Sequence, residues 1–127
     1  QTCALPIFNH KVESGNYVCV SHVSDHEILR NLAAKSFTIA NEHGIIRHIV
    51  EKKVVSDNFC IGGYKFSSSR LFMSAFENLQ TNREVFVSDV IEILLGNGEI
   101  FFNKEVQDYV DVGTIETWSD YNEKVIK

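Results

Sequence analysis

Apolar side chains recur along the chain in short runs that predict alternating strands and helices. Residues 17–23 and 59–66 are rich in β-branched and aromatic side chains, which favour strands. Residues 37–40 and 45–50 are two more β-prone runs. The loop between them, residues 41–44, contains Asn and Gly, which accept the positive φ of a tight turn. We therefore predict two strands and a β-hairpin.

Apolar residues at helical spacing indicate four helices, each with a polar residue that can cap its start. They are residues 25–34 behind Ser24 or Asp25, residues 71–79 behind the serines 67–69, residues 90–95 between a Ser88–Asp89 cap and a Gly96–Asn97–Gly98 stop, and a last helix that begins at Thr114. Strands are predicted at 99–102 and 106–110.

No repeat, low-complexity tract or Pro/Gly-rich linker divides the 127 residues, so we predict one domain over 1–127. The element order indicates an α/β fold with mixed strands and flanking helices. The formal charge of −5 is spread without a basic stripe, which excludes the usual nucleic-acid footprint. No apolar run approaches the roughly 20 residues that span a bilayer, and the N-terminus lacks the features of a secretory signal. We expect a cytoplasmic protein without a membrane partner.

Several kinds of reactive site find no support in the sequence. Cys3, Cys19 and Cys60 are widely spaced in apolar surroundings, which argues against a disulfide framework or a zinc site, and we interpret Cys19 and Cys60 as core residues. The histidines do not have metal-ligand spacing, and the serines 67–69 lack an evident base. A Gly-x-x-x-x-Gly-Lys loop is absent, which excludes a P-loop.

Three constellations are candidates for chemistry. Glu51, Lys52 and Lys53 follow a predicted strand, where an acid can accept from sugar hydroxyls and an ammonium can hold a phosphate; such charges are more often solvated caps. Gly62 and Gly63, before Tyr64, allow a ligand close to the main chain, or else form a bulge. For the glycine pair, a ligand contact and a structural bulge remain equally open.

The third constellation is Asp111, which ends the predicted strand 106–110 just before Gly113 and Thr114. A carboxylate at the end of a strand can bind a hard cation such as Mg²⁺ together with phosphate oxygens. The alternative to a metal-binding role is a structural one, as a turn or capping aspartate, and local chemistry alone favours the structural role.

The order of these motifs resembles the second half of bacterial sugar-1-phosphate nucleotidylyltransferases, over approximately residues 44–121. The resemblance implies a partial Rossmann-like nucleotidyltransferase sheet. It also implies that Glu51 contacts sugar hydroxyls, Lys52 the sugar phosphate and the Gly62 backbone the sugar, with Tyr64 beside it. Asp111 matches the family's magnesium-binding aspartate, and Lys52 and Asp111 are the residues to which the resemblance gives catalytic roles.

Some features depart from the family pattern. Tyr109 and Val110 stand where a tryptophan is usual, and Lys53 stands where many members have proline. Ser88 and Asp89, preceded by Glu84, resemble the family's Glu-Ile-Thr-Asp segment, but three residues separate Glu84 from Ser88. These departures suggest a divergent branch, serving capsule or other polysaccharide synthesis.

The implied reaction joins a sugar 1-phosphate and a nucleoside triphosphate, with Mg²⁺, to give a nucleotide sugar and pyrophosphate. We expect the chain to be the C-terminal, sugar-phosphate-binding part of such a domain. The N-terminal nucleotide-binding part is then absent, and the 127 residues are inactive alone. A non-catalytic assembly module and a sensing domain that binds sugar phosphates without turnover are the alternatives. We also expect self-association to a homo-oligomer, because a truncated sheet exposes an edge.

Overall fold

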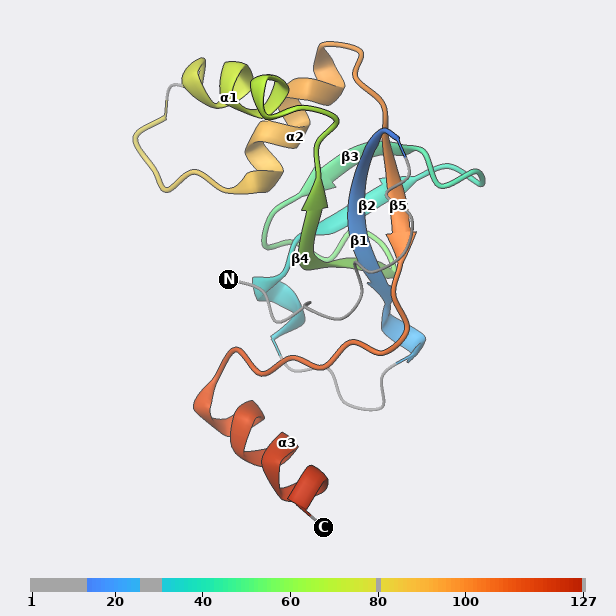
Figure 1. Ribbon diagram of the computed structural model, residues 1–127, viewed down its shortest axis with the longest axis vertical. Coiled ribbons are helices and arrows are strands. Elements are labelled where there is room, and N and C mark those ends of the chain that lie inside the picture. The colour runs from blue at the N-terminus through green and yellow to red at the C-terminus, as the bar shows by residue number, and fades with distance from the viewer. Residues whose placement is uncertain (1–13, 26–30, 80, 127) are drawn as a thin grey trace.

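The computed structural model describes residues 14–25, 31–79 and 81–126, in which a curved sheet carries helices on one face (Figure 1). Its strands are β1 (Asn16–His22), β2 (Phe37–Ala40), β3 (Ile46–Val50), β4 (Asn58–Lys65) and β5 (Phe101–Glu105). Its α-helices are α1 (Ser69–Glu77), α2 (Val87–Gly96) and α3 (Ile115–Ile126).

The five strands lie in the order β3-β2-β4-β1-β5. β1 pairs in parallel with β5, and the other neighbouring strands are antiparallel. The hairpin tip approaches β5, where Ile45 bridges to Phe102 and the Asn103 N–H donates to the Gly44 carbonyl at 2.8 Å. The expected α/β class, with a mixed sheet and flanking helices, is confirmed.

Alternation along the strands divides the core between the two faces of the sheet. Val18 and Val20 pack with residues of α1 and α2, including Ala75, Ile91 and Leu94. On the other face a smaller aromatic cluster contains, among its buried residues, Cys19, Phe37, Phe59, Ile61 and Val106, with Tyr109 packed against it. Cys19 and Cys60 are buried core residues, as predicted. Burial is the main cause that raises the pKa of Cys60 to about 12, and nearby negative charge adds to it.

The predicted hairpin is confirmed as β2 and β3. The Asn41 side chain accepts from the N–H groups of His43 and Ile45, and Gly44 takes a φ of 77°. Such local bonds and a left-handed glycine favour a tight turn wherever the surrounding strands can pair.

The glycine pair in β4 does form a bulge. Val18 faces Tyr64 while Val20 faces Cys60, so Cys19 alone spans the stretch that contains Gly62 and Gly63. Gly62 has a φ of 87°, a conformation that costs little without a β-carbon.

The predicted helix over 25–34 is wrong in its described part, and residues 26–30 lie outside the described residues. Short 3₁₀ turns occupy Val23–Asp25 and Leu32–Ala34. Asn31 has a φ of 60°, and a left-handed residue cannot continue a right-handed helix.

The predicted strand over 106–110 is also wrong. Val106 still donates to the Val20 carbonyl at 2.8 Å, but the chain then leaves the sheet, so Asp111 lies in an irregular segment rather than at a strand end. The β-branched composition of this stretch favours a strand, but a strand needs a partner to pair with. The predicted strand 99–102 is found slightly later, as β5.

Both inner helices are confirmed, with one correction. The Ser68 side chain caps α1 by accepting from the Leu71 N–H at 3.2 Å. α2 begins at Val87, so Ser88 lies within its first turn and is not the cap. Asp89 takes the capping role instead, because its carboxylate accepts from the Phe86 N–H at 2.8 Å.

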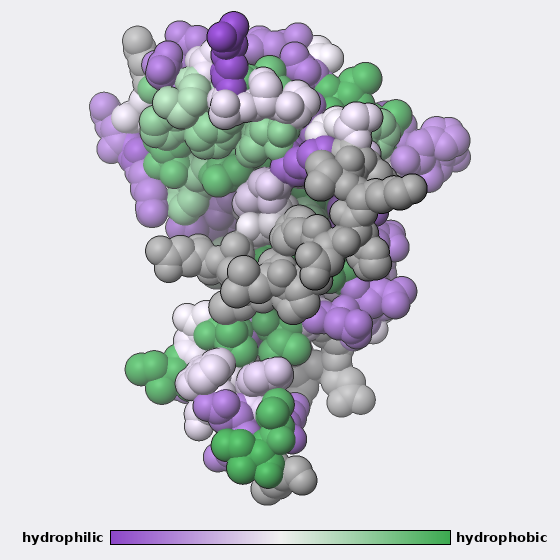
Figure 2. Space-filling view, in the orientation of Figure 1, coloured by the Kyte–Doolittle hydropathy of each residue, from purple (hydrophilic) through white to green (hydrophobic). Residues whose placement is uncertain are grey.

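α3 begins after Thr114, as predicted, and Thr114 and Thr117 cap it by exchanging side-chain to backbone hydrogen bonds. It lies apart from the sheet and exposes apolar side chains, among them Ile115, Trp118, Val125 and Ile126 (Figures 1 and 2). Over the described ranges, no helix has the length and apolarity needed to cross a membrane.

Candidate functional site

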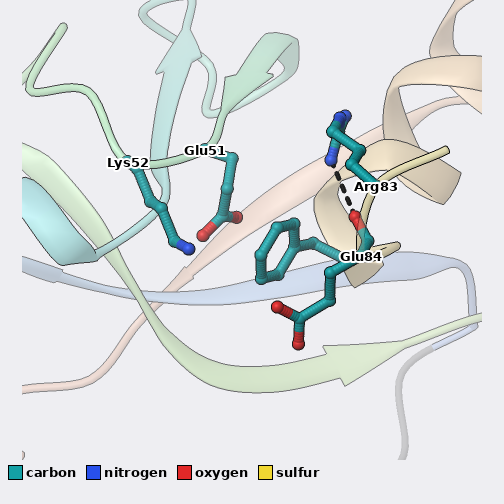
Figure 3. Close-up of a pocket in the computed structure, with 5 residues that line it drawn as sticks. Glu51, Lys52, Arg83 and Glu84 are labelled. Carbon is teal, nitrogen blue, oxygen red and sulfur yellow. Dashed lines mark hydrogen bonds between the residues drawn. The ribbon is translucent and has the colours of Figure 1, made fainter. Parts of the chain in front are cut away.

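A cavity of about 430 Å³ opens between the turn that follows β3 and the segment that leads into α2. Its lining comprises Glu51, Lys52, Arg83, Glu84 and Phe86. Figure 3 shows the Glu51 carboxylate and the Lys52 ammonium on the same side, facing the 83–86 segment. The volume is in the usual range for small-molecule sites, which is roughly 300–1,000 Å³.

Glu51 is held by hydroxyl groups from two other parts of the chain. Ser36 precedes β2, and its Oγ donates a hydrogen bond to Glu51 Oε2. Ser88, in the first turn of α2, donates to the same oxygen at 2.7 Å. Both serines are buried, so these bonds are sheltered from competing water.

Lys52 has a backbone conformation that is unusual for a side-chain-bearing residue. Its φ is 54°, in the left-handed region that costs roughly 1–2 kcal/mol for an L-residue. The Lys52 N–H donates to the Lys35 carbonyl at 3.1 Å, which holds this conformation. Its Nζ lies 4.5 Å from the centre of the Phe86 ring, a cation–π distance. Strained residues of this kind concentrate at functional sites.

The opposite wall of the cavity is stiffened by a bidentate ion pair. The Arg83 guanidinium contacts both carboxylate oxygens of Asp89, at 2.6 and 3.1 Å, and the Glu84 carbonyl at 2.9 Å. The hydrogen bond from Arg83 holds the pKa of Asp89 below its ordinary value. Partial burial opposes this shift, and the hydrogen bond from the Phe86 N–H supports it. The segment therefore presents Arg83, Glu84 and Phe86 in a fixed arrangement.

Asp111 is paired with Lys35. Lys35 Nζ lies 2.7 Å from Asp111 Oδ2 and 3.2 Å from the Tyr109 hydroxyl, and it packs over the Phe59 and Tyr109 rings. Asp111 Oδ1 accepts from the Gly113 N–H at 2.9 Å. Asp111 thus lies beside the aromatic cluster, whereas the Glu51 carboxylate meets α2.

The neighbouring residues Lys35 and Ser36 connect these two places. Extended backbone sends successive side chains in opposite directions, so the Lys35 side chain reaches Asp111 while Ser36 reaches Glu51. Asp111 is not among the described residues that line the cavity.

The remaining predicted site residues lie close to Glu51 or in the bulge. Tyr64 lies near Glu51 and Ser36. Burial, followed by electrostatic interaction with Cys60 and Glu51, raises the pKa of Tyr64 well above its ordinary value, against a lowering effect of Ser36. The phenol therefore keeps its proton. Gly62 lies in the bulge of the same strand, two residues from Tyr64.

The described residues fit a divalent cation in donor type but not in number. Asp111 offers the carboxylate oxygen that Mg²⁺ prefers. Both of its oxygens already have partners, and within the described ranges no group of three His, Cys, Asp or Glu side chains forms a metal site. A metal at Asp111 would need Lys35 to withdraw and further ligands to join.

The Lys35–Asp111 pair predicts an acid-sensitive contribution to stability. Partial burial raises the pKa of Asp111, but the hydrogen bonds from Lys35 and Gly113 and the Lys35 charge together lower it below 3.8. A folded-state pKa below the unfolded one gives stability that is present above about pH 4 and is lost as pH falls through the folded-state value. Denaturant unfolding from pH 2.5 to 7 should therefore show a smaller acid loss in Asp111→Asn than in the wild type. Asp108→Asn, at an exposed site nearby, is the control, and an equal acid loss in all three proteins would contradict the prediction.

No protein-family model matches this sequence, and no curated protein matches it. Solved structures do match. A nucleoside-diphosphate-sugar pyrophosphorylase from Vibrio cholerae RC9 is similar with a TM-score of 0.73 and 16% identity, over 87% of this chain and 47% of that one.

Two further structures agree. A UDP-glucose pyrophosphorylase complexed with UDP-glucose has a TM-score of 0.63 at 18% identity, over 87% of this chain and 45% of that one. An inositol-1-phosphate CTP transferase from T. maritima has a TM-score of 0.60 at 15% identity, over 90% of this chain and 48% of that one. The chain thus spans slightly less than half of each of these proteins. At such identities the likeness shows the fold alone: this chain has the fold of slightly less than half of each of these proteins.

Proposed function

We propose that this chain is the C-terminal, sugar-phosphate-binding part of a nucleotidyltransferase domain, and that its cavity holds a sugar 1-phosphate. The observation that carries the proposal is the cavity lined by Glu51, Lys52, Arg83, Glu84 and Phe86, in a chain with this fold. Carboxylates and cations on facing walls suit a ligand that combines hydroxyl groups with a phosphate.

Within this proposal Lys52 and Glu51 divide the ligand between them. The Lys52 ammonium neutralises the phosphate as a point charge. The Glu51 carboxylate accepts hydrogen bonds from sugar hydroxyls, and Phe86 offers an apolar surface to the ring. Gly62 and Tyr64 lie on β4 and are not among the described residues that line the cavity. The proposal keeps them as further contacts of the sugar, with the glycine leaving room for close approach to the main chain.

The reaction proposed for the intact enzyme is nucleotidyl transfer. An oxygen of the sugar phosphate attacks the α-phosphorus of a nucleoside triphosphate, forming an O–P bond, and the bond from that phosphorus to the bridging oxygen breaks to release pyrophosphate. Lys52 reduces the charge repulsion between the two phosphates. The nucleotide sugar produced is the kind of precursor that capsule and other polysaccharide synthesis consumes.

Asp111 enters the proposal as one carboxylate ligand of a Mg²⁺ ion, which would neutralise phosphate charge when bound. Its other ligands would have to come from groups beyond the described residues. With a single carboxylate, and no cradle assigned to the nucleotide, we propose that the 127-residue chain binds sugar phosphate without turnover. Pyrophosphate release by this chain alone, with Mg²⁺ and both substrates, would contradict that part of the proposal.

A non-catalytic sugar-phosphate-binding module is the second candidate. It is favoured by the pairing of Asp111 with Lys35, which leaves the cavity walls complete but the aspartate occupied. The two candidates share the cavity and differ in the intact protein: Asp111→Asn removes transferase activity in the first and has no activity to remove in the second.

Titration calorimetry tests the shared claim. We expect the chain to bind at least one of α-D-glucose 1-phosphate, α-D-mannose 1-phosphate and N-acetyl-α-D-glucosamine 1-phosphate more tightly than it binds inorganic phosphate. Heats no larger than those of inorganic phosphate for the whole panel would overturn the sugar-phosphate proposal.

A further inference from the structure

The strongest unused feature beside the cavity is the set of hydroxyl groups around Glu51. Ser36 and Ser88 come from distant parts of the chain and both donate to Oε2. Their exposed fractions are 7% and 2%, so neither hydroxyl is a surface group that meets the carboxylate by chance.

Both donors use one oxygen, which leaves the other with its acceptor capacity. A carboxylate has about four lone-pair positions, and two hydroxyl groups fill those of Oε2. Since Glu51 lines the cavity, Oε1 is the oxygen available to a ligand there. The arrangement fixes one end of the carboxylate and presents the other.

These two bonds tie Glu51 to the segment before β2 and to the first turn of α2 at once. In partly buried surroundings a hydrogen bond to a charged group is stronger than it is in water.

The position of Ser88 in its helix supports a role of this kind. A serine before or at the start of a helix commonly caps it. Here Asp89 provides the cap from within the first turn, and the Ser88 hydroxyl is directed to Glu51 instead. The serine is therefore not required to start α2.

We propose that Ser36 and Ser88 are positioning residues that hold the Glu51 carboxylate so that its free oxygen accepts a sugar hydroxyl. This inference rests on the proposed function for its ligand. It predicts that these serines contribute to recognition of the sugar and not of the phosphate, which Lys52 binds.

The test compares Ser36→Ala and Ser88→Ala with the wild type. Each is expected to weaken binding of the tightest sugar 1-phosphate of the panel about tenfold, because an aligned charge-assisted bond depends on the orientation of Glu51. Affinity for inorganic phosphate should stay within about twofold. Ser56→Ala, which removes another partly buried hydrogen-bonded serine, should change neither affinity.

A double-mutant cycle separates positioning from general destabilisation. In a Glu51→Gln background the additional effect of Ser36→Ala or Ser88→Ala on sugar-phosphate affinity should fall to less than about twofold, because the orientation of the carboxylate no longer matters. A full tenfold loss in that background, or losses equal for sugar phosphate and phosphate, would overturn the inference. Each serine variant is compared with the wild type separately, so either one that folds decides the result.

A measurement without ligand distinguishes failure of this inference from failure of the proposed function. Side-chain ¹³C relaxation should show lower order for the Glu51 methylene groups in either serine variant than in the wild type or in Ser56→Ala. Unchanged order would overturn the positioning role even if sugar phosphates bind. Lower order in the serine variants, combined with a wild type that binds none of the panel, would instead reject the proposed ligand and retain the positioning of Glu51.

Discussion

Replacing Lys52 with Met is expected to weaken sugar 1-phosphate binding by about 10- to 100-fold, because a charge-assisted bond to phosphate is worth about 1.5–3 kcal/mol. The ammonium lies at the cavity, beside Glu51 and above the Phe86 ring. Removing it leaves the phosphate without its nearest lysine. Titration calorimetry on both proteins at low salt measures the effect.

Lys53→Met is the matched control, since Lys53 is also exposed and carries the same charge, but is not among the described residues that line the cavity. It should lower affinity by less than about twofold, through long-range charge alone. Equal losses in the two variants would show that the net charge of the turn, and not the placement of Lys52, attracts the phosphate.

Lys52→Gly adds a check on folding. Glycine adopts the observed φ of 54° without strain, so its release of roughly 1–2 kcal/mol offsets the loss of the contact with Phe86 and the added freedom of the unfolded chain. Binding should fall as in Lys52→Met while the free energy of unfolding stays within about 1 kcal/mol of the wild type. A protein that binds as tightly as the wild type would contradict the role of the ammonium.

Replacing Phe59 with Ala should have the largest effect on stability, lowering the free energy of unfolding by about 3–5 kcal/mol. Phe59 is 0% exposed, and its ring packs edge-on against Tyr109 at 5.6 Å and beneath the Lys35 ammonium. The substitution therefore leaves a cavity and also loosens the support of the Lys35–Asp111 pair. Urea unfolding followed by circular dichroism measures the change.

Phe76→Ala is the control for the loss of an aromatic ring. Phe76 is 45% exposed on α1 and stacks on Phe72, so its removal should cost about 1 kcal/mol or less. Similar losses for Phe59→Ala and Phe76→Ala would contradict the view that the aromatic cluster anchors the segment that carries Asp111.

The parts of the fold that local chemistry determines were predictable from the sequence. The hairpin follows from Asn41 and Gly44, whose turn needs no distant partner. The start of α1 follows from Ser68 in the same way. The strand predicted at 106–110 is absent because pairing with β1 ends near Val20. The sequence of the stretch itself does not indicate where its partner strand ends.

Of the residues that line the cavity, the sequence singled out Glu51 and Lys52 but not their partners, and it gave no signal for Arg83 or Phe86. Glu51 and Lys52 follow directly from their position after a strand. The contact between Ser36 and Glu51 depends on a shift of the β2–β3 register between Ile39 and Ala40. Because of this shift, Phe37 pairs with Val50. A regular hairpin counted from the turn would have set Lys35 opposite Glu51. The pairing of Asp111 with Lys35 and the role of Ser88 are equally non-local.

The most direct test of the central claim is an NMR titration of the ¹⁵N-labelled chain with α-D-glucose 1-phosphate, and then with the other two sugar phosphates if it gives no shifts. We expect saturable shifts for the amides of the residues that line the cavity, Glu51, Lys52, Arg83, Glu84 and Phe86, and little change in α3. Saturable shifts confined to α3 or to the Asp111 segment, or no saturable shifts with any of the three, would contradict it.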